Sequence, residues 1–155
     1  MSHHYSLKLH WTGNRGTGTS HYRAYDRNHT IVFENKPELL VSADPTFRGD
    51  PTRYNPEELL LAALSGCHLM SFLHVCASAG VIVTAYRDNA SGTMVLNADG
   101  SGHFTQVTLN PVVTVTETSM LAALDGLHQK ANRLCFIANS VNFPVYHKAI
   151  GTIGA

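Results

Sequence analysis

The sequence has little charge. It holds 11 basic and 11 acidic residues among 155, or 14% of the chain, and its formal net charge is zero. An average soluble domain is about 25% charged. Without a basic patch or stripe the chain is not expected to bind nucleic acid or the surface of a membrane. Hydrophobic residues make up 44% of the chain, which excludes disorder. Sparse charge with zero net charge favours association, so we predict that part of the surface faces a second copy.

Cysteine is also scarce, and its spacing fits neither a zinc site nor a secreted disulfide framework. Cys67, Cys76 and Cys135 form no CxxC pair for zinc, and an odd number at wide spacing is not a secreted disulfide framework. The ten histidines are scattered without HxH or HExxH, so we expect no metal and no cofactor. The N-terminus lacks a charged segment followed by an apolar run, so we expect no signal peptide and a cytoplasmic protein with reduced thiols.

Residues 56–79 are predicted to form a long helix. Asn55 precedes Pro56 at the first helical position, Glu58 completes a capping box, and Gly80 ends the helix. The helix is apolar on nearly every face, and its length would suit a membrane span. The histidines and serines within it, and the absence of flanking Lys or Arg, argue against that alternative. We therefore predict a central helix buried on all sides, with a second chain helping to cover it.

The rest of the pattern predicts an α+β fold in a single domain over residues 1–155. Alternation predicts strands near residues 5–12, 21–25 and 30–34, followed by a long irregular loop over 35–54. Residues 81–96 and 103–116 are predicted as two long strands of a hairpin. Thr118 or Ser119 is expected to cap a second, amphipathic helix, and residues 141–150 to form a last strand.

The cysteine spacing limits which thiols can pair. Cys67 and Cys76 are nine residues apart, about 180° around and ~13.5 Å along one helix, whereas a disulfide needs Cα atoms within about 7 Å. A redox pair must therefore include Cys135, and Cys67 is its better partner because Ser65 and Gly66 leave room around the sulfur. Cys76 is interpreted as a buried structural thiol. The alternative for Cys67 is a small apolar residue packed in a core.

A reactive thiol needs a cation to stabilise its thiolate. Cys67 lies too far from the helix start for the helix dipole, but Arg48 and Arg53 lie in the loop before the helix. Either arginine could serve. Because Glu58 occupies the capping position, Glu57 is free to orient an arginine.

These residues resemble those of a known family. The stretch from Asn55 to Leu60, Ala62-Ala63 and then Cys67 is similar to the OsmC/Ohr family of thiol-dependent peroxidases, with a second cysteine, Cys135, 68 residues later. Three features depart from that family's pattern: Phe136 follows Cys135 where proline is common, and His68 and Cys76 are additional.

The resemblance implies an OsmC-like fold, with antiparallel sheets around a buried central helix in an intertwined homodimer. It also implies reduction of organic hydroperoxides, with Cys67 peroxidatic, Cys135 resolving, and Glu57 paired with a loop arginine, for which Arg48 is the candidate and Arg53 stays open. The resemblance further implies recycling by an external dithiol, often a dihydrolipoyl protein in this family. We expect no nucleic-acid or membrane partner.

Two other functions remain as alternatives. One is a non-catalytic dimer that binds an apolar ligand, and the other is a redox sensor in which a Cys67–Cys135 disulfide alters a partner interface. The joint presence of both cysteines, the arginine loop and Glu57 favours the enzyme, because a binding protein would not need Cys135.

Overall fold

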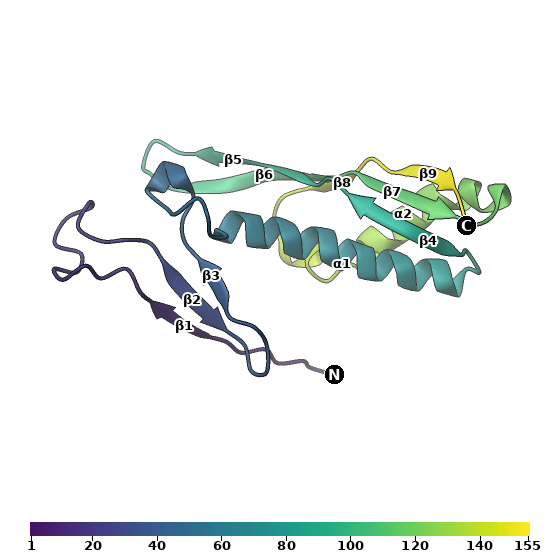
Figure 1. The fold of residues 1–155 in the computed structure, drawn as a ribbon. Coiled ribbons are helices and arrows are strands. Elements are labelled where there is room, and N and C mark those ends of the chain that lie inside the picture. The colour runs from purple at the N-terminus through teal and green to yellow at the C-terminus, as the bar shows by residue number, and fades with distance from the viewer. The chain divides into compact units, whose positions relative to one another are not determined.

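The chain divides into two units, residues 1–60 and 61–155, in the computed structural model, which describes all 155 residues. Figure 1 shows their elements, and each unit is described by itself. The single domain predicted for residues 1–155 stays a prediction.

The first unit is built on a three-stranded antiparallel sheet of β1 (Lys8–Trp11), β2 (His29–Val32) and β3 (Leu39–Val41), in that order. The predicted strand over residues 21–25 is wrong. Its residues form turns, because the Arg27 guanidinium donates to the Tyr22 and Tyr25 carbonyls and lies over both rings, 4.3 and 4.1 Å from their centroids. Strand β3 lies inside the region predicted as an irregular loop.

The rest of that loop prepares the start of the long helix. A single 3-10 turn, η1 (Pro45–Phe47), is capped by the Asp44 carboxylate, which accepts from the Thr46 amide at 2.7 Å. The predicted capping box is confirmed. The Asn55 side chain accepts from the Glu58 amide at 2.9 Å, and the Asn55 amide donates to the Glu58 carboxylate at 3.2 Å. These bonds satisfy two of the amides that a helix start leaves free.

Helix α1 (Pro56–Ser78) ends as predicted at Gly80, which adopts a left-handed φ of 72°. The Val81 amide then donates to the Cys76 carbonyl at 2.9 Å, which closes the end of the helix. Within one chain only one face of α1 is buried, through Leu64, His68, Phe72, Val75 and Cys76. By length and composition alone α1 could also cross a membrane.

The second unit contains two three-stranded sheets in which each predicted long strand is broken at the same level. Residues 81–96 form β4 (Val83–Asp88) and β5 (Ser91–Leu96), and residues 103–116 form β6 (Gly102–Leu109) and β7 (Pro111–Val115). The break has a local cause. Pro111 lacks an amide proton for the ladder, and the Asp88 carboxylate accepts from the Asn110 amide at 2.7 Å.

Two short strands complete these sheets. The predicted last strand, residues 141–150, is instead β8 (Val145–His147) and β9 (Ile150–Ile153). They pair in parallel with β6 and β7, giving the orders β5-β6-β8 and β4-β7-β9. The fold is therefore α+β as predicted, with mixed rather than purely antiparallel sheets.

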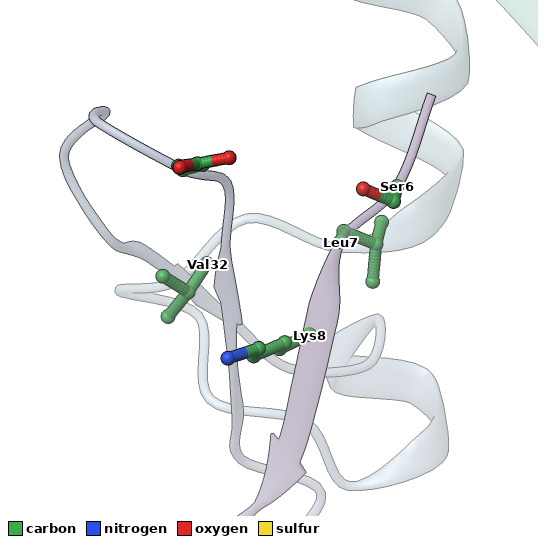
Figure 2. Close-up of a pocket in the computed structure, with 5 residues that line it drawn as sticks. Ser6, Leu7, Lys8 and Val32 are labelled. Atoms are coloured by element: carbon green, nitrogen blue, oxygen red, sulfur yellow. The ribbon is translucent and has the colours of Figure 1, made fainter. Parts of the chain in front are cut away.

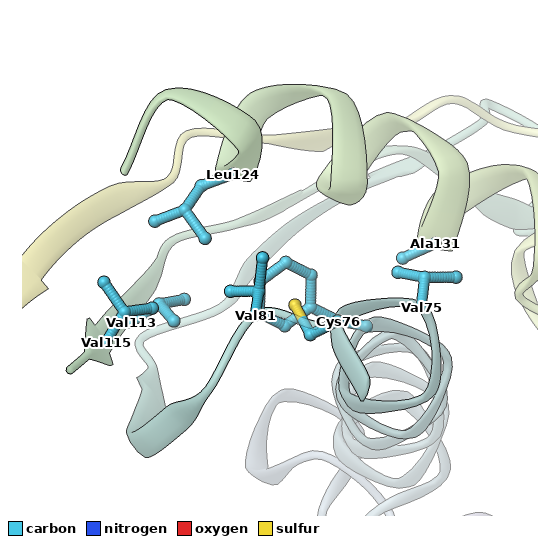
Figure 3. Close-up of a cluster of buried hydrophobic side chains, with 8 residues drawn as sticks. Val75, Cys76, Val81, Val113, Val115, Leu124 and Ala131 are labelled. Atoms are coloured by element: carbon cyan, nitrogen blue, oxygen red, sulfur yellow. The ribbon is translucent and has the colours of Figure 1, made fainter. Parts of the chain in front are cut away.

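The second helix, α2 (Leu124–Leu134), follows a 3-10 turn, η2 (Thr118–Ala123), and precedes another, η3 (Ala138–Ser140). The predicted cap at Thr118 or Ser119 is wrong, because the helical region starts at Thr118, with Glu117 at the N-cap position and no side-chain cap. The core lies between α1, α2 and the β4-β7-β9 sheet, and Figure 3 shows its side chains. Its members are Phe72, Val75, Cys76, Val81, Val113, Val115, Leu124 and Ala131.

Candidate active site

Two thiols that lie 68 residues apart in the sequence meet in the second unit. Cys67 is near the middle of α1, and Cys135 follows directly on the last residue of α2. The Cys67 thiol is near enough to Cys135 to raise the pKa of Cys135, and both thiols are free. The sequence reasoning that excluded a Cys67–Cys76 pair agrees with this geometry, since Cys76 is 1% exposed and packs in the core (Figure 3).

Burial distinguishes the two thiols. Cys67 is half-buried, whereas Cys135 is 1% exposed. Burial, together with the neighbouring Cys67 thiol, raises the pKa of Cys135 to about 11, and the Ala138 amide partly opposes this by donating to its sulfur at 3.4 Å. Cys135 is therefore a protonated thiol at neutral pH, and Cys67 is the sulfur of the pair that a dissolved reagent reaches first.

The backbone around Cys67 is anchored on one side and open on the other. The Ser65 hydroxyl donates to the Asp88 carboxylate at 2.5 Å, which ties this turn of α1 to the end of β4. Gly66 has no heavy atom within 4 Å of the place a Cβ would occupy. The room predicted beside Cys67 thus comes from Gly66, while Ser65 holds the helix.

An apolar groove of about 340 Å³ is lined by residues that lie close in the sequence to both cysteines. Its walls are Met70, Ser71 and His74, on the turns of α1 that follow Cys67, and Leu134 and Phe136, on either side of Cys135. Met70 is 61% exposed and Phe136 is 79% exposed. Because apolar side chains dominate its walls, the groove suits an organic group rather than an ion.

The first unit supplies the predicted arginines and the acidic residue. Arg48 ends η1 in a left-handed conformation with φ 65° and is exposed, without an ion pair in the chain. Arg53 is occupied, with its guanidinium 3.7 Å from the Asp50 carboxylate and 3.5 Å from the His29 carbonyl. Of the two candidates, Arg48 is the one whose guanidinium is available to another group.

Glu58 caps the helix as predicted, and Glu57 makes no ion pair within the chain. Glu57 lines a pocket of about 330 Å³ together with the aromatic rings of Trp11, Tyr25 and Phe47. The Arg27 guanidinium, which lies over the Tyr25 ring, lines the same pocket, so these rings already hold one cation.

A further pocket in the first unit carries no comparable chemistry. Figure 2 shows it where β1 begins and β2 ends, and its lining residues are Ser6, Leu7, Lys8, Val32 and Glu34. None of these side chains is a cysteine or a histidine, so the thiol pair remains the candidate site.

Sequence reasoning missed three contributors to this site: Asp88, Phe136 and His68 as a buried side chain. Asp88 and Phe136 act through contacts between distant segments, which no local pattern reveals. His68 carried a signal, because a histidine next to a reactive cysteine in an apolar helix is unusual, but its partner could not be named from the sequence.

Comparison with known proteins identifies the family. The family profile described as OsmC-like protein matches residues 49–148. An OsmC-like protein of unknown function from Vibrio cholerae is 34% identical, with a TM-score of 0.84, and the alignment covers 96% of this chain and 100% of that one. No curated protein sequence matches.

Two structures of proteins named for organic hydroperoxide resistance share the fold. One, from Elizabethkingia anophelis, is 19% identical with a TM-score of 0.69, and the alignment covers 99% of this chain and 100% of that one. The other, from Legionella pneumophila, is 15% identical with a TM-score of 0.70 and 97% coverage of both chains. The predicted family and OsmC-like α+β fold are thus confirmed, with α1 as the long helix of that fold, while the predicted homodimer stays a prediction. The chain belongs to the OsmC-like protein family.

Proposed function

We propose that the protein is a thiol-dependent peroxidase that reduces organic hydroperoxides to alcohols. The single observation that carries this proposal is the pair formed by half-buried Cys67 and buried Cys135, beside an apolar groove. The names of two structural neighbours, organic hydroperoxide resistance proteins, support the same substrate class.

The chemistry follows from thiolate reactivity. The Cys67 thiolate attacks the terminal oxygen of the hydroperoxide, the O–O bond breaks, and the departing alkoxide takes a proton to become the alcohol. Cys67 is thereby oxidised by two electrons to a sulfenic acid. The Cys135 sulfur then attacks the Cys67 sulfur, a disulfide forms, and water leaves. The nearness of the two thiols favours this second step, while the high pKa of Cys135 keeps it from competing for the peroxide.

An external dithiol completes the cycle by exchange, through a mixed disulfide that its second thiol resolves. The family resemblance suggests a dihydrolipoyl protein as that reductant. A cycle that returns both cysteines to free thiols suits a reducing compartment such as the cytoplasm.

We assign the cation that stabilises the Cys67 thiolate to Arg48, with Glu57 holding its guanidinium. Support comes from the unpaired state of both side chains within the chain. A guanidinium can donate to a carboxylate from one edge and present its remaining N–H groups to a thiolate. Substitution of Arg48 by Met is expected to lower kcat/KM at least ~100-fold, a loss of about 3 kcal/mol. Arg53→Met and Arg15→Met are the matched controls, and a comparable loss in one of them would move the role to that arginine.

We also propose that the active protein is a homodimer in which α1 packs against a second copy. The face of α1 that carries Ala62, Ala63, Gly66 and Met70 is exposed in one chain although it is apolar. Small residues on a helix face allow another helix to approach closely. A stable monomer at micromolar concentration in sedimentation would contradict this assignment.

The function is tested by turnover of cumene hydroperoxide with dihydrolipoamide as reductant. Wild type and Cys76→Ser should turn over, Cys67→Ser should not, and Cys135→Ser should accumulate a sulfenic acid that dimedone traps. Equal slow consumption of peroxide by wild type and Cys67→Ser would refute the enzyme. In that case, saturable binding of an apolar probe in the groove would support a binding protein.

A further inference from the structure

A buried pair of histidines joins the two helices that carry the thiols. His68, the residue after Cys67, is 1% exposed, and His128, on α2, is fully buried. The His68 Nε2 and His128 Nδ1 atoms are 3.0 Å apart, so one ring donates a hydrogen bond to the other. His128 also stacks on Phe72 of α1, with ring centroids 3.9 Å apart and planes 8° from parallel.

The position of this pair relates it to the thiols. His128 precedes Cys135 by seven residues, which is two helical turns and about 10.5 Å along α2, so both lie on the same face. On α1, His68 adjoins Cys67. The same two elements therefore carry both contacts, which start from neighbouring residues of α1 and are two turns apart on α2.

The pair is not explained by stability. The outer nitrogens, His68 Nδ1 and His128 Nε2, have no hydrogen-bond partner although they are buried. Whichever tautomers are present, one buried N–H has no partner within the protein, so the pair carries a polar cost that apolar side chains would not. The two hydrogen-bonding nitrogens point at each other, 3.0 Å apart, rather than at a shared metal centre, and the His147 ring lies beside both rings, with centroids 5.6 and 5.7 Å away.

We propose that His68 and His128 are positioning residues whose hydrogen bond holds Cys135 against Cys67 for disulfide formation. This inference rests on the proposed function for the peroxide step but concerns the thiol pair itself. Loss of the bond removes the polar contact between α2 and α1 nearest to Cys67, and we expect this to lower the effective concentration of one thiol at the other. A net hydrogen bond of about 1 kcal/mol corresponds to roughly a fivefold change.

The experiment compares His68→Leu, which removes the bond, with His68→Gln, whose amide nitrogen can replace Nε2. His128→Phe, which keeps the stack on Phe72 without the bond, is the second variant in case His68→Leu does not fold. His103→Leu, at an exposed position of β6, is the matched control. In each protein the Cys67–Cys135 disulfide is equilibrated against dithiothreitol without peroxide. In parallel, one equivalent of cumene hydroperoxide is added with dimedone, and the ratio of trapped sulfenic acid to disulfide is measured by mass spectrometry.

We expect the Cys67–Cys135 disulfide of His68→Leu and of His128→Phe to be about fivefold or more easier to reduce than that of wild type. The ratio of trapped sulfenic acid to disulfide should rise by a similar factor. His68→Gln and His103→Leu should match wild type. Melting temperatures of the apolar variants should be unchanged or higher. A merely structural role would not give a weaker disulfide together with an unchanged or higher melting temperature. A dithiothreitol equilibrium in His68→Leu and His128→Phe equal to that of wild type would overturn the proposal. If peroxide oxidises no thiol in any protein, the proposed function fails, while the dithiothreitol equilibrium still decides the role of the histidines.

Discussion

Acid should destabilise this protein through its buried histidine pair. Burial lowers the pKa of His68 to about 4 and that of His128 to about 3, and in each case a neighbouring imidazole lowers it further. The pair faces His147, whose pKa is also lowered by burial, while the charge of Asp88 partly opposes the shift at His68. In an unfolded chain both imidazoles would titrate near pH 6.5.

The sign and size of the effect follow from this difference. Between pH 6.5 and about 4 the unfolded chain binds protons on both imidazoles and the folded chain does not, so stability is complete above pH 6.5 and is lost as the pH falls. At pH 5 the loss is about 2 kcal/mol for each histidine, or about 4 kcal/mol for the pair.

The measurement is urea unfolding at pH 7.5 and pH 5.0, with a reductant and at one protein concentration, because dimerisation makes stability depend on concentration. The comparison protein is the double variant His68→Gln/His128→Asn, which keeps two neutral polar side chains that do not titrate. Wild type should lose about 4 kcal/mol more than the variant between the two pH values. A difference below about 1 kcal/mol would show that the buried imidazoles are protonated in the folded protein and would refute the reasoning.

Other variants test the groove, the loop and the dimer. Phe136→Ser removes an apolar wall of the groove and should lower kcat/KM for cumene hydroperoxide about tenfold but not that for hydrogen peroxide, since burying an aromatic contributes about 1.5–3 kcal/mol; equal losses for both peroxides would contradict the groove's role. Gly49→Ala would place a Cβ 1.7 Å from the Ala43 carbonyl oxygen and should lower stability by about 1–3 kcal/mol in a thermal melt; an unchanged melt would contradict this fit. A Cβ added by Gly66→Ala would have no heavy atom within 4 Å in one chain. The substitution should therefore weaken dimerisation, measured by sedimentation, only if the face of α1 that carries Gly66 contacts a second copy. Gly126→Ala, equally open on α2, is its control and should add about 0.5–1 kcal/mol of stability.

Local chemistry made much of the fold predictable. Asn55, Pro56, Glu58 and Gly80 mark both ends of α1 because caps act within a few residues of themselves. The breaks in the long strands were missed because they depend on Asp88 meeting the Asn110 amide across two strands. The strand predicted over residues 21–25 was wrong for a similar reason, since the Arg27 side chain donates hydrogen bonds to backbone carbonyls of that segment.

Part of the candidate site could likewise be predicted from the sequence, and part could not. The nearness of Cys67 to Cys135 could be predicted, because helix geometry excluded a Cys67–Cys76 pair, and the small neighbours of Cys67 made it the better partner for Cys135. The groove and the histidine pair could not, since both are made where α2 meets α1. Phe136, which departs from the family's usual proline, is interpretable only once the structure places it on the wall of a groove.

The measurement that tests the central claim most directly is a thiol count on the reduced protein before and after one equivalent of cumene hydroperoxide, with the disulfide mapped by mass spectrometry. The account predicts that two of the three thiols disappear, that Cys67 and Cys135 are joined, and that Cys76 stays free. Retention of all three thiols, or a disulfide that includes Cys76, would contradict it.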